Sequence, residues 1–234
     1  MQPEQIDPFA EGKVLLINKP LHWTSFDVVR KIRSIIKIKK VGHAGTLDPL
    51  ATGLLIVCTG KFTKKINEYM SGEKEYTGSF TLGATTPTYD LESEPENFKD
   101  YGHITENKLH ELTEQFTGQI SQVPPAHSAI KQHGKPVYEM ARKGIAVKLE
   151  PRTLLIKSFT ITGIELPEVY FKVVCSTGTY IRSLAHDYGQ ALGCGAYLSS
   201  LCRTRIGVFT LEDAMSMEAF QQMAKTLKQQ DGNR

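Results

Sequence analysis

The sequence lacks features that define several large classes of protein. No apolar stretch approaches the roughly 18 residues that a membrane-spanning helix needs, and the acidic first seven residues contain no apolar signal-peptide core. The seven histidines show no HExxH or other metal-ligand spacing. We therefore expect a cytoplasmic protein without a metal site.

Cysteine is also scarce, and its four residues form no CxxC pair. Cys58 and Cys175 stand inside apolar runs, which predicts small buried side chains in a reducing compartment.

The net charge is only +3, so the distribution of charge along the chain is more informative than its sum. The acidic run over residues 90–100 is typical of a solvated face.

Asp48 occupies an unusual place in this distribution. It is the only acid between residues 28 and 65, a span that carries nine Lys or Arg side chains. Such a field attracts a polyanion, and if the polyanion is a nucleic acid, Asp48 is placed to act on it. The simpler alternative is a helix cap or a turn, because Asp caps helices and Pro occupies their first turn. That alternative does not explain Gly42, Gly45 and Gly53, which indicate sharp turns and a close approach.

Periodicity predicts the elements around this segment. Apolar runs and alternation predict strands, at residues 13–18, 54–59, 75–82, 154–165, 169–175 and 204–209. Apolar stripes predict helices, at residues 24–38, 61–70, 105–117, 137–143, from about 181 to 193, and near the C-terminus. Thr24 and Asp27 form a capping box, and Gly118 is the expected stop of its helix. Strands outnumber helices without a βαβ rhythm, so the predicted class is α+β.

A second segment with site character runs from the strand before Cys175 through Ser-Thr-Gly-Thr into a helix, the form of a phosphate-binding turn. Arg182 lies in the first helical turn, where the helix dipole disfavours a cation, so it requires an anionic partner. Asp187, Asp48 and an RNA phosphate are the alternatives. Tyr76 has two interpretations as well, core packing or a ligand contact, and His43 could be a turn residue.

Taken together, these motifs resemble the TruB family of tRNA pseudouridine synthases. The strongest motif is Gly-His-Ala-Gly-Thr-Leu-Asp-Pro-Leu-Ala-Thr-Gly-Leu at residues 42–54. Supporting motifs follow in the family's order, at residues 18–20 with 24–25, 74–76, 123–129 with 134–138, 175–182 and 192–196. Two stretches depart from the family pattern, since His22 replaces a turn glycine and residues 86–93 read Thr-Pro-Thr-Tyr-Asp-Leu-Glu-Ser.

The resemblance implies a role for each site residue. Asp48 would be the nucleophilic aspartate, Tyr76 would stack on the target base, and Arg182 would pair with Asp48. His43 would fill space left by flipped nucleotides, and Tyr180 and Leu201 would line the uridine pocket. The candidate RNA-backbone contacts are the basic residues Lys19, Arg30, Lys61, Lys64, Lys65, Lys131 and Arg142.

The resemblance also implies the fold and the activity. We expect one catalytic domain over residues 1–234, with a central, mixed and mainly antiparallel sheet flanked by helices and loops. A thumb would be inserted at residues 121–150, and a helical extension at 210–234 would stand in place of an RNA-binding PUA domain. The implied reaction converts uridine 55 in the T-arm of tRNA to pseudouridine by base flipping, without a cofactor. A monomer is expected, with tRNA as its partner, no membrane and no obligate protein partner.

Two alternative functions remain open at this point. One is a guide-RNA-dependent rRNA pseudouridine synthase, and the other is a non-catalytic tRNA-binding or folding module. The chemical route also stays open, because Asp48 could attack carbon 6 of the base or the anomeric carbon, or assist removal of a 2′-proton through a glycal.

Overall fold

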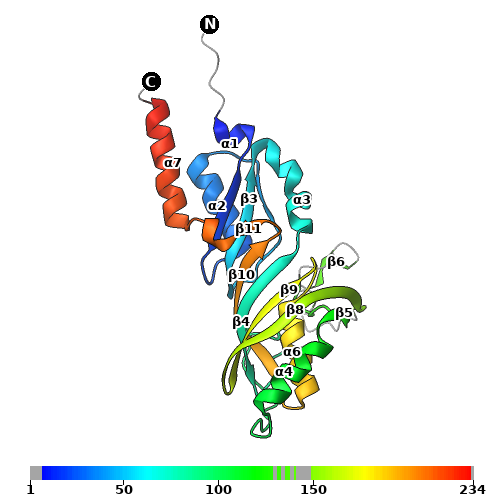
Figure 1. Ribbon diagram of the computed structural model, residues 1–234. Coiled ribbons are helices and arrows are strands. Elements are labelled where there is room, and N and C mark those ends of the chain that lie inside the picture. The colour runs from blue at the N-terminus through cyan, green and yellow to red at the C-terminus, as the bar shows by residue number, and fades with distance from the viewer. Residues whose placement is uncertain (1–6, 129–130, 133–134, 138–139, 141–148, 233–234) are drawn as a thin grey trace. The chain divides into compact units, whose positions relative to one another are not determined.

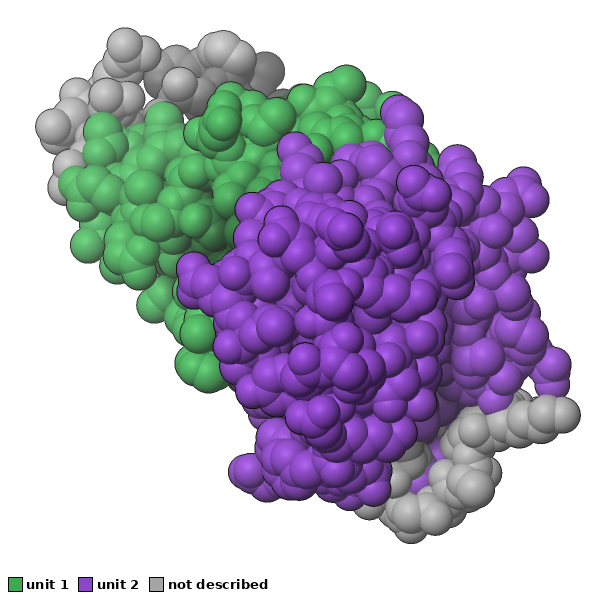
Figure 2. Space-filling model, turned by 60° about the horizontal axis from the view of Figure 1, so that its bottom comes forward, with its two compact units in different colours: residues 1–75, 202–234 green, residues 76–201 purple. Residues whose placement is uncertain are grey.

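The computed structural model describes residues 7–128, 131–132, 135–137, 140 and 149–232. It divides into two compact units, Met1–Glu75 with Cys202–Arg234 (unit 1) and Tyr76–Leu201 (unit 2) (Figure 2). The boundary falls inside two strands, β4 (Lys74–Leu82) and β10 (Ala196–Ile206). The expectation of a single catalytic domain with a thumb and a C-terminal extension stays a prediction.

Unit 1 is built around the buried strand β3 (Ala51–Thr59), which pairs antiparallel with β1 (Val14–Lys19) and β2 (Val41–Ala44). The remaining elements are α1 (Pro8–Glu11), α2 (Ser25–Ile36), the 3-10 helix η1 (Gly60–Lys65), α3 (Ile66–Ser71), β11 (Phe209–Thr210), the 3-10 helix η2 (Leu211–Asp213) and α7 (Met217–Gly232) (Figure 1).

Successive side chains of β3 point to opposite faces of the sheet, and each face contributes to one of two apolar clusters in unit 1. Leu55 and Val57 pack with the stripe of α2 and with Phe220 of α7. Leu54, Ile56 and Cys58 instead face Ile206 and the side chains of η1 and α3. Cys58 is buried as predicted, and burial raises the pKa of its thiol to about 11. Helix α2 begins with the predicted capping box, in which Thr24 and Asp27 bond reciprocally.

Unit 2 is a sheet with the strand order β10-β4-β9-β8-β5. The hairpin of β8 (Arg152–Glu165) and β9 (Glu168–Cys175) lies beside β5 (Gly118–Gln122). Strands β6 (Lys131–Gln132) and β7 (Lys135–Pro136) pair antiparallel in a separate two-stranded sheet. The described residues of unit 2 also include the helices α4 (Glu106–Gln115) and α6 (Ile181–Leu192) (Figure 1). Together with unit 1, this confirms the α+β class.

An aromatic cluster joins the sheet of unit 2 to its helices. Phe80 of β4 stacks on Phe171 of β9 at 5.3 Å between ring centroids, and Phe159 of β8 meets both at their edges. Tyr188 of α6 contacts this cluster, and its hydroxyl donates to the carbonyl oxygen of Leu109 in α4. The cluster fixes α6, and therefore Arg182, against the sheet.

Several element predictions need correction. Residues 61–70 lie in η1 followed by α3 rather than in one helix. Helix α4 ends at Gln115 with Phe116 as its C-cap, so that Gly118 begins β5. The predicted strands did not include β2, β5 or residues 196–203 of β10, because these stretches are short on apolar alternation and depend on pairing with distant strands. The helix expected at 137–143 falls mostly outside the described residues.

Candidate active site

Asp48 lies in a loop between two strands, not at a helix start. Strand β2 ends at Ala44, a turn occupies residues 49–50, and β3 begins at Ala51. The backbone N–H of Ala51 donates to the carbonyl oxygen of Asp48 at 3.1 Å, which closes the turn. The helix start is therefore wrong and the turn is confirmed, and the half-buried Asp48 is carried by a loop that leads into β3.

Arg203 of β10 binds the backbone of this loop. Its guanidinium is 1% exposed and donates to the carbonyl oxygens of Leu54 at 2.9 Å, Gly45 at 3.1 Å and Thr46 at 3.4 Å. The same strand explains Gly53, where a Cβ atom would lie 2.4 Å from the carbonyl oxygen of Arg203. The close approach that the glycines indicated is thus made by the protein's own strand. Sequence reasoning missed Arg203, because no local pattern links it to residues 158 positions away.

The two neighbours of Asp48 are anchored as well. The backbone N–H of Leu47 donates to Ser25 Oγ at 2.9 Å, and that hydroxyl donates back to the Leu47 carbonyl at 3.2 Å. On the other side, the N–H of His22 donates to the Pro49 carbonyl at 2.9 Å. The backbone on both sides of Asp48 is therefore fixed, which limits the positions that its carboxylate can take.

Lys19 has a different role from the predicted RNA contact. Its side chain is fully buried, and its ammonium donates to the carbonyl oxygens of Trp23 at 2.6 Å, Pro20 at 3.0 Å and Pro49 at 3.4 Å. Burial lowers the pKa of Lys19 to about 8, although the charge of Asp48 opposes the shift. Because a phosphate cannot reach an ammonium enclosed in this way, Lys19 supports the Asp48 turn instead.

His43 lies half-buried on β2, within the same motif as Asp48. Burial, followed by the nearby charge of Arg203, lowers the pKa of His43 below its ordinary value. The imidazole is consequently neutral at pH 7. A neutral ring can pack against a nucleotide without the cost of removing a charge from water.

Arg182 is buried in unit 2 near the start of α6. Its Nε lies 3.6 Å from the Asp90 carboxylate, and its terminal nitrogens donate to the carbonyl oxygens of Thr88 and His127. Asp90 was not among the partners considered, and it is 3% exposed although its acidic run was expected to be solvated. Burial of a cation at a helix start requires such an anion.

The other predicted pocket residues also belong to unit 2. Tyr76 is 8% exposed on the same strand face as Phe80, and Tyr180 is the N-cap residue of α6, with its backbone bonded to the side chain of Gln122. Leu201 is half-buried on β10. Asp48 lies in unit 1, so its pairing with Arg182 and a shared pocket with Tyr76 stay predictions.

The remaining basic candidates differ in their surroundings. Lys64 and Lys65 are exposed, and the ammonium of Lys65 lies 4.9 Å from the centroid of the Phe62 ring. Arg30 and Lys61 are 72% exposed, and they pair with Asp27 at 2.7 Å and Glu11 at 2.8 Å. The backbone of Lys131 lies in β6, and Arg142 is outside the described residues.

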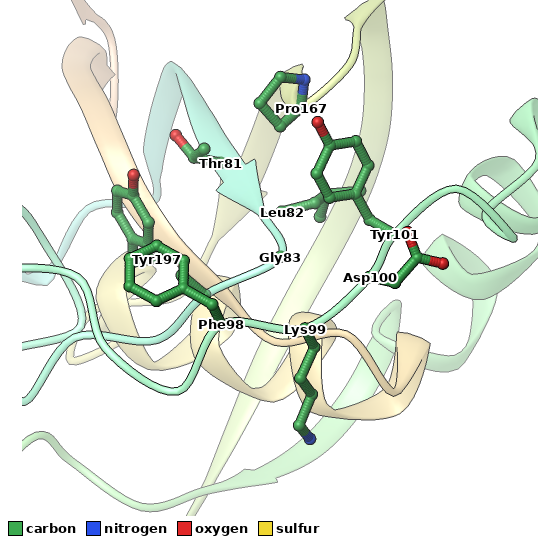
Figure 3. A pocket seen from close by; sticks show the side chains of 10 residues that line it. Thr81, Leu82, Gly83, Phe98, Lys99, Asp100, Tyr101, Pro167 and Tyr197 are labelled. Carbon is green, nitrogen blue, oxygen red and sulfur yellow. The ribbon is translucent and has the colours of Figure 1, made fainter.

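A separate pocket of about 470 Å³ opens in unit 2. Figure 3 shows the rings of Phe98 and Tyr197 on one side and Tyr101 beside Pro167 on the other, while the Lys99 side chain points away. None of the predicted site residues lines it, and its walls are mainly apolar. This pocket therefore does not gather the groups that the sequence singled out.

In the part of the chain that the structure describes, no group of three or more His, Cys, Asp or Glu side chains could hold a metal ion. None of the helices in those ranges combines the length and apolar character that a membrane crossing requires.

Comparison with solved structures places the fold. A chain of a Cbf5-Nop10-Gar1 complex superposes with a TM-score of 0.72 at 32% identity, over 92% of this chain and 54% of that chain. A chain of an H/ACA RNP bound to substrate RNA gives 0.72 at 28% identity, over 95% of this chain and 56% of that one. This chain thus spans about half the length of those proteins. The architecture is the pseudouridine synthase fold.

Sequence comparison narrows the class to one family. A model of the N-terminal domain of TruB family pseudouridylate synthases matches residues 33–181, and one of the tRNA pseudouridylate synthase B C-terminal domain matches 182–234. The tRNA pseudouridine synthase B of Flavobacterium johnsoniae is 51% identical over 229 residues, which cover 95% of this chain and 99% of that protein. That of Phocaeicola vulgatus is 51% identical over 218 residues, 91% of this chain and 93% of that protein. The chain belongs to the TruB family of pseudouridylate synthases.

Proposed function

We propose that this protein isomerises uridine 55 in the T-arm of tRNA to pseudouridine. The observation that carries the proposal is Asp48, held in the family's motif by Arg203, Ser25 and His22. The relatives at about half identity are named for activity on tRNA, which favours this substrate over a guide-RNA-dependent reaction or a non-catalytic module.

The reaction breaks the bond between N1 of the base and C1′ of the ribose and forms a bond from C5 to C1′. The C5 proton is lost and N1 takes up a proton, so no oxidant, reductant or energy source is consumed. The target nucleotide must leave the base stack, at a cost of a few kcal/mol. Asp48 then acts on the extruded uridine by one of the three routes open to a carboxylate.

The remaining residues hold that nucleotide. Tyr76 stacks on the base, Tyr180 and Leu201 line its pocket, and neutral His43 fills space that the flipped nucleotides leave. Arg182 pairs with Asp48 and keeps the carboxylate ionised. Exposed basic residues, including Lys64 and Lys65, bind phosphates.

The expected setting of the enzyme completes the proposal. It acts as one cytoplasmic catalytic domain and as a monomer, with tRNA as its only obligate partner. No cofactor takes part, since the isomerisation is balanced without one.

The test is pseudouridine mapping in an unmodified tRNA transcript, with no cofactor and with EDTA present. Wild type should modify position 55, and Asp48→Asn should lose turnover while RNA affinity changes by less than about tenfold, the range of one altered polar contact. Asp213→Asn, which changes an exposed carboxylate of the same unit, is the matched control. Modification confined to another arm, or an active Asp48→Asn variant, would overturn the proposal.

A further inference from the structure

Tyr89 holds a backbone conformation that residues with a Cβ atom rarely adopt. Its φ is 64°, in the left-handed region. The residue lies in the turn before Asp90, where its carbonyl oxygen accepts a hydrogen bond of 2.9 Å from the N–H of Leu198. A half-buried tyrosine at such a position needs a compensating interaction.

The compensating interaction is a ring stack on helix α6. The rings of Tyr89 and His186 lie 3.9 Å apart between centroids, with 18° between their planes. Among the described residues, the buried Nδ1 of His186 has no hydrogen-bond partner. The stack on Tyr89 therefore restrains the orientation of this imidazole.

Both chain neighbours of Tyr89 bind the same arginine. The carbonyl oxygen of Thr88 accepts from Arg182 at 3.2 Å, and the carboxylate of Asp90 lies 3.6 Å from Arg182 Nε. His186 follows Arg182 by four residues, so the two side chains share one side of α6. The stack and the arginine contacts thus join the same turn to the same helix face.

We propose that the Tyr89–His186 stack is a clamp that positions Arg182 through the turn of residues 88–90. Tyr89 is a positioning residue, since it acts on Arg182 and not on the substrate. The proposal rests on the proposed function, in which Arg182 pairs with Asp48. The clamp explains why Tyr89 keeps a strained backbone conformation, within the stretch at residues 86–93 that departs from the family pattern.

The central experiment compares Tyr89→Gly with Tyr89→Phe. Glycine accepts a φ of 64° without strain, so Tyr89→Gly keeps the turn and removes only the ring. We expect kcat for pseudouridine formation to fall about tenfold or more, with KM for tRNA within twofold and Tm unchanged or higher. Tyr89→Phe keeps the stack and should retain at least half of the wild-type kcat.

Two further variants test the partner and the strain. His186→Ala should reproduce the kcat loss of Tyr89→Gly, and the double variant should be no slower than either single variant. Asn97→Gly is the matched control, because Asn97 is an exposed left-handed residue of the same unit with φ 54°. It should leave kcat unchanged.

A readout without RNA separates the clamp from the proposed function. In protein labelled with ¹⁵N-arginine, the Nε–H resonance of Arg182, assigned with Arg182→Lys, should be sharp in wild type and Tyr89→Phe and broadened in Tyr89→Gly. A wild-type enzyme inactive on tRNA with these line shapes would refute the function and retain the clamp. Wild-type kcat and a sharp resonance in Tyr89→Gly would overturn the clamp alone.

Discussion

The guanidinium of Arg203 donates a hydrogen bond of 3.1 Å to the carbonyl oxygen of Gly45, three residues before Asp48. With its bonds to Thr46 and Leu54, one buried cation satisfies three carbonyl groups of the segment that carries Asp48. Loops generally move more than the strands beside them. Here the hydrogen bonds from Arg203 attach the loop to β10, which gives Asp48 a fixed position within unit 1.

Arg203→Met should therefore damage both stability and turnover. The substitution leaves buried carbonyl groups without a donor, at about 1–3 kcal/mol for each group, and releases the Asp48 loop. We expect a lower Tm and a kcat reduced at least tenfold at a temperature where the variant is folded. Arg205→Met on the same strand is the control, since Arg205 is a partly exposed residue paired with Glu73. A folded Arg203→Met variant with normal kcat would show that the loop needs no such support.

Replacement of Tyr76 separates base stacking from core packing. Tyr76→Leu should lower turnover more than tenfold, because stacking on one base contributes about 1–3 kcal/mol, while Tyr76→Phe should keep most activity. Phe80→Leu is the control for packing, as Phe80 lies four residues along the same buried face. If both leucine variants lose Tm and activity in equal proportion, Tyr76 is a core residue only.

Neutralisation of Asp187 should stabilise the folded protein, by an amount that depends on pH. Burial raises the pKa of Asp187 to about 6, whereas an unfolded chain releases this proton near pH 4. Between these values the native state holds more protons than the unfolded state, so its stability falls as pH rises. Asp187→Asn should raise Tm at pH 7.5 and leave it nearly unchanged at pH 4. Equal shifts at both pH values would contradict the burial of this carboxyl.

Charge reversal at Lys64 and Lys65 tests the basic surface of unit 1. The double change to Glu should weaken tRNA binding and flatten its salt dependence, because each lost phosphate contact lowers the slope of log K against log salt by about 0.7–0.9. Turnover at saturating RNA should persist, since Asp48 is untouched. Reversal of Lys108 and Lys225, both exposed, is the matched control. The same loss in both double variants would indicate a general charge effect.

The sequence by itself determined the parts of the molecule that depend on neighbouring residues. The capping box of Thr24 and Asp27 bonds within one helical turn, so its pattern can be read directly. The alternation of β4 likewise placed Tyr76 on the buried face with Phe80. The motif around Asp48 identified the family, because its residue types and spacing are specific even without the fold.

Tertiary structure decided what distant residues do to one another. Pro49 enters a turn and not a helix, because β3 begins at Ala51 and pairs with β1 from Gly53 and with β2 from Ile56. Lys19 is buried because carbonyl groups of two separate turns converge on its ammonium. Arg203 donates to Gly45, which is 158 residues away in the sequence, and Arg182 lies beside Asp90, which belongs to another element. Such pairs carry no local signature, since their energy arises only when packing removes both partners from water.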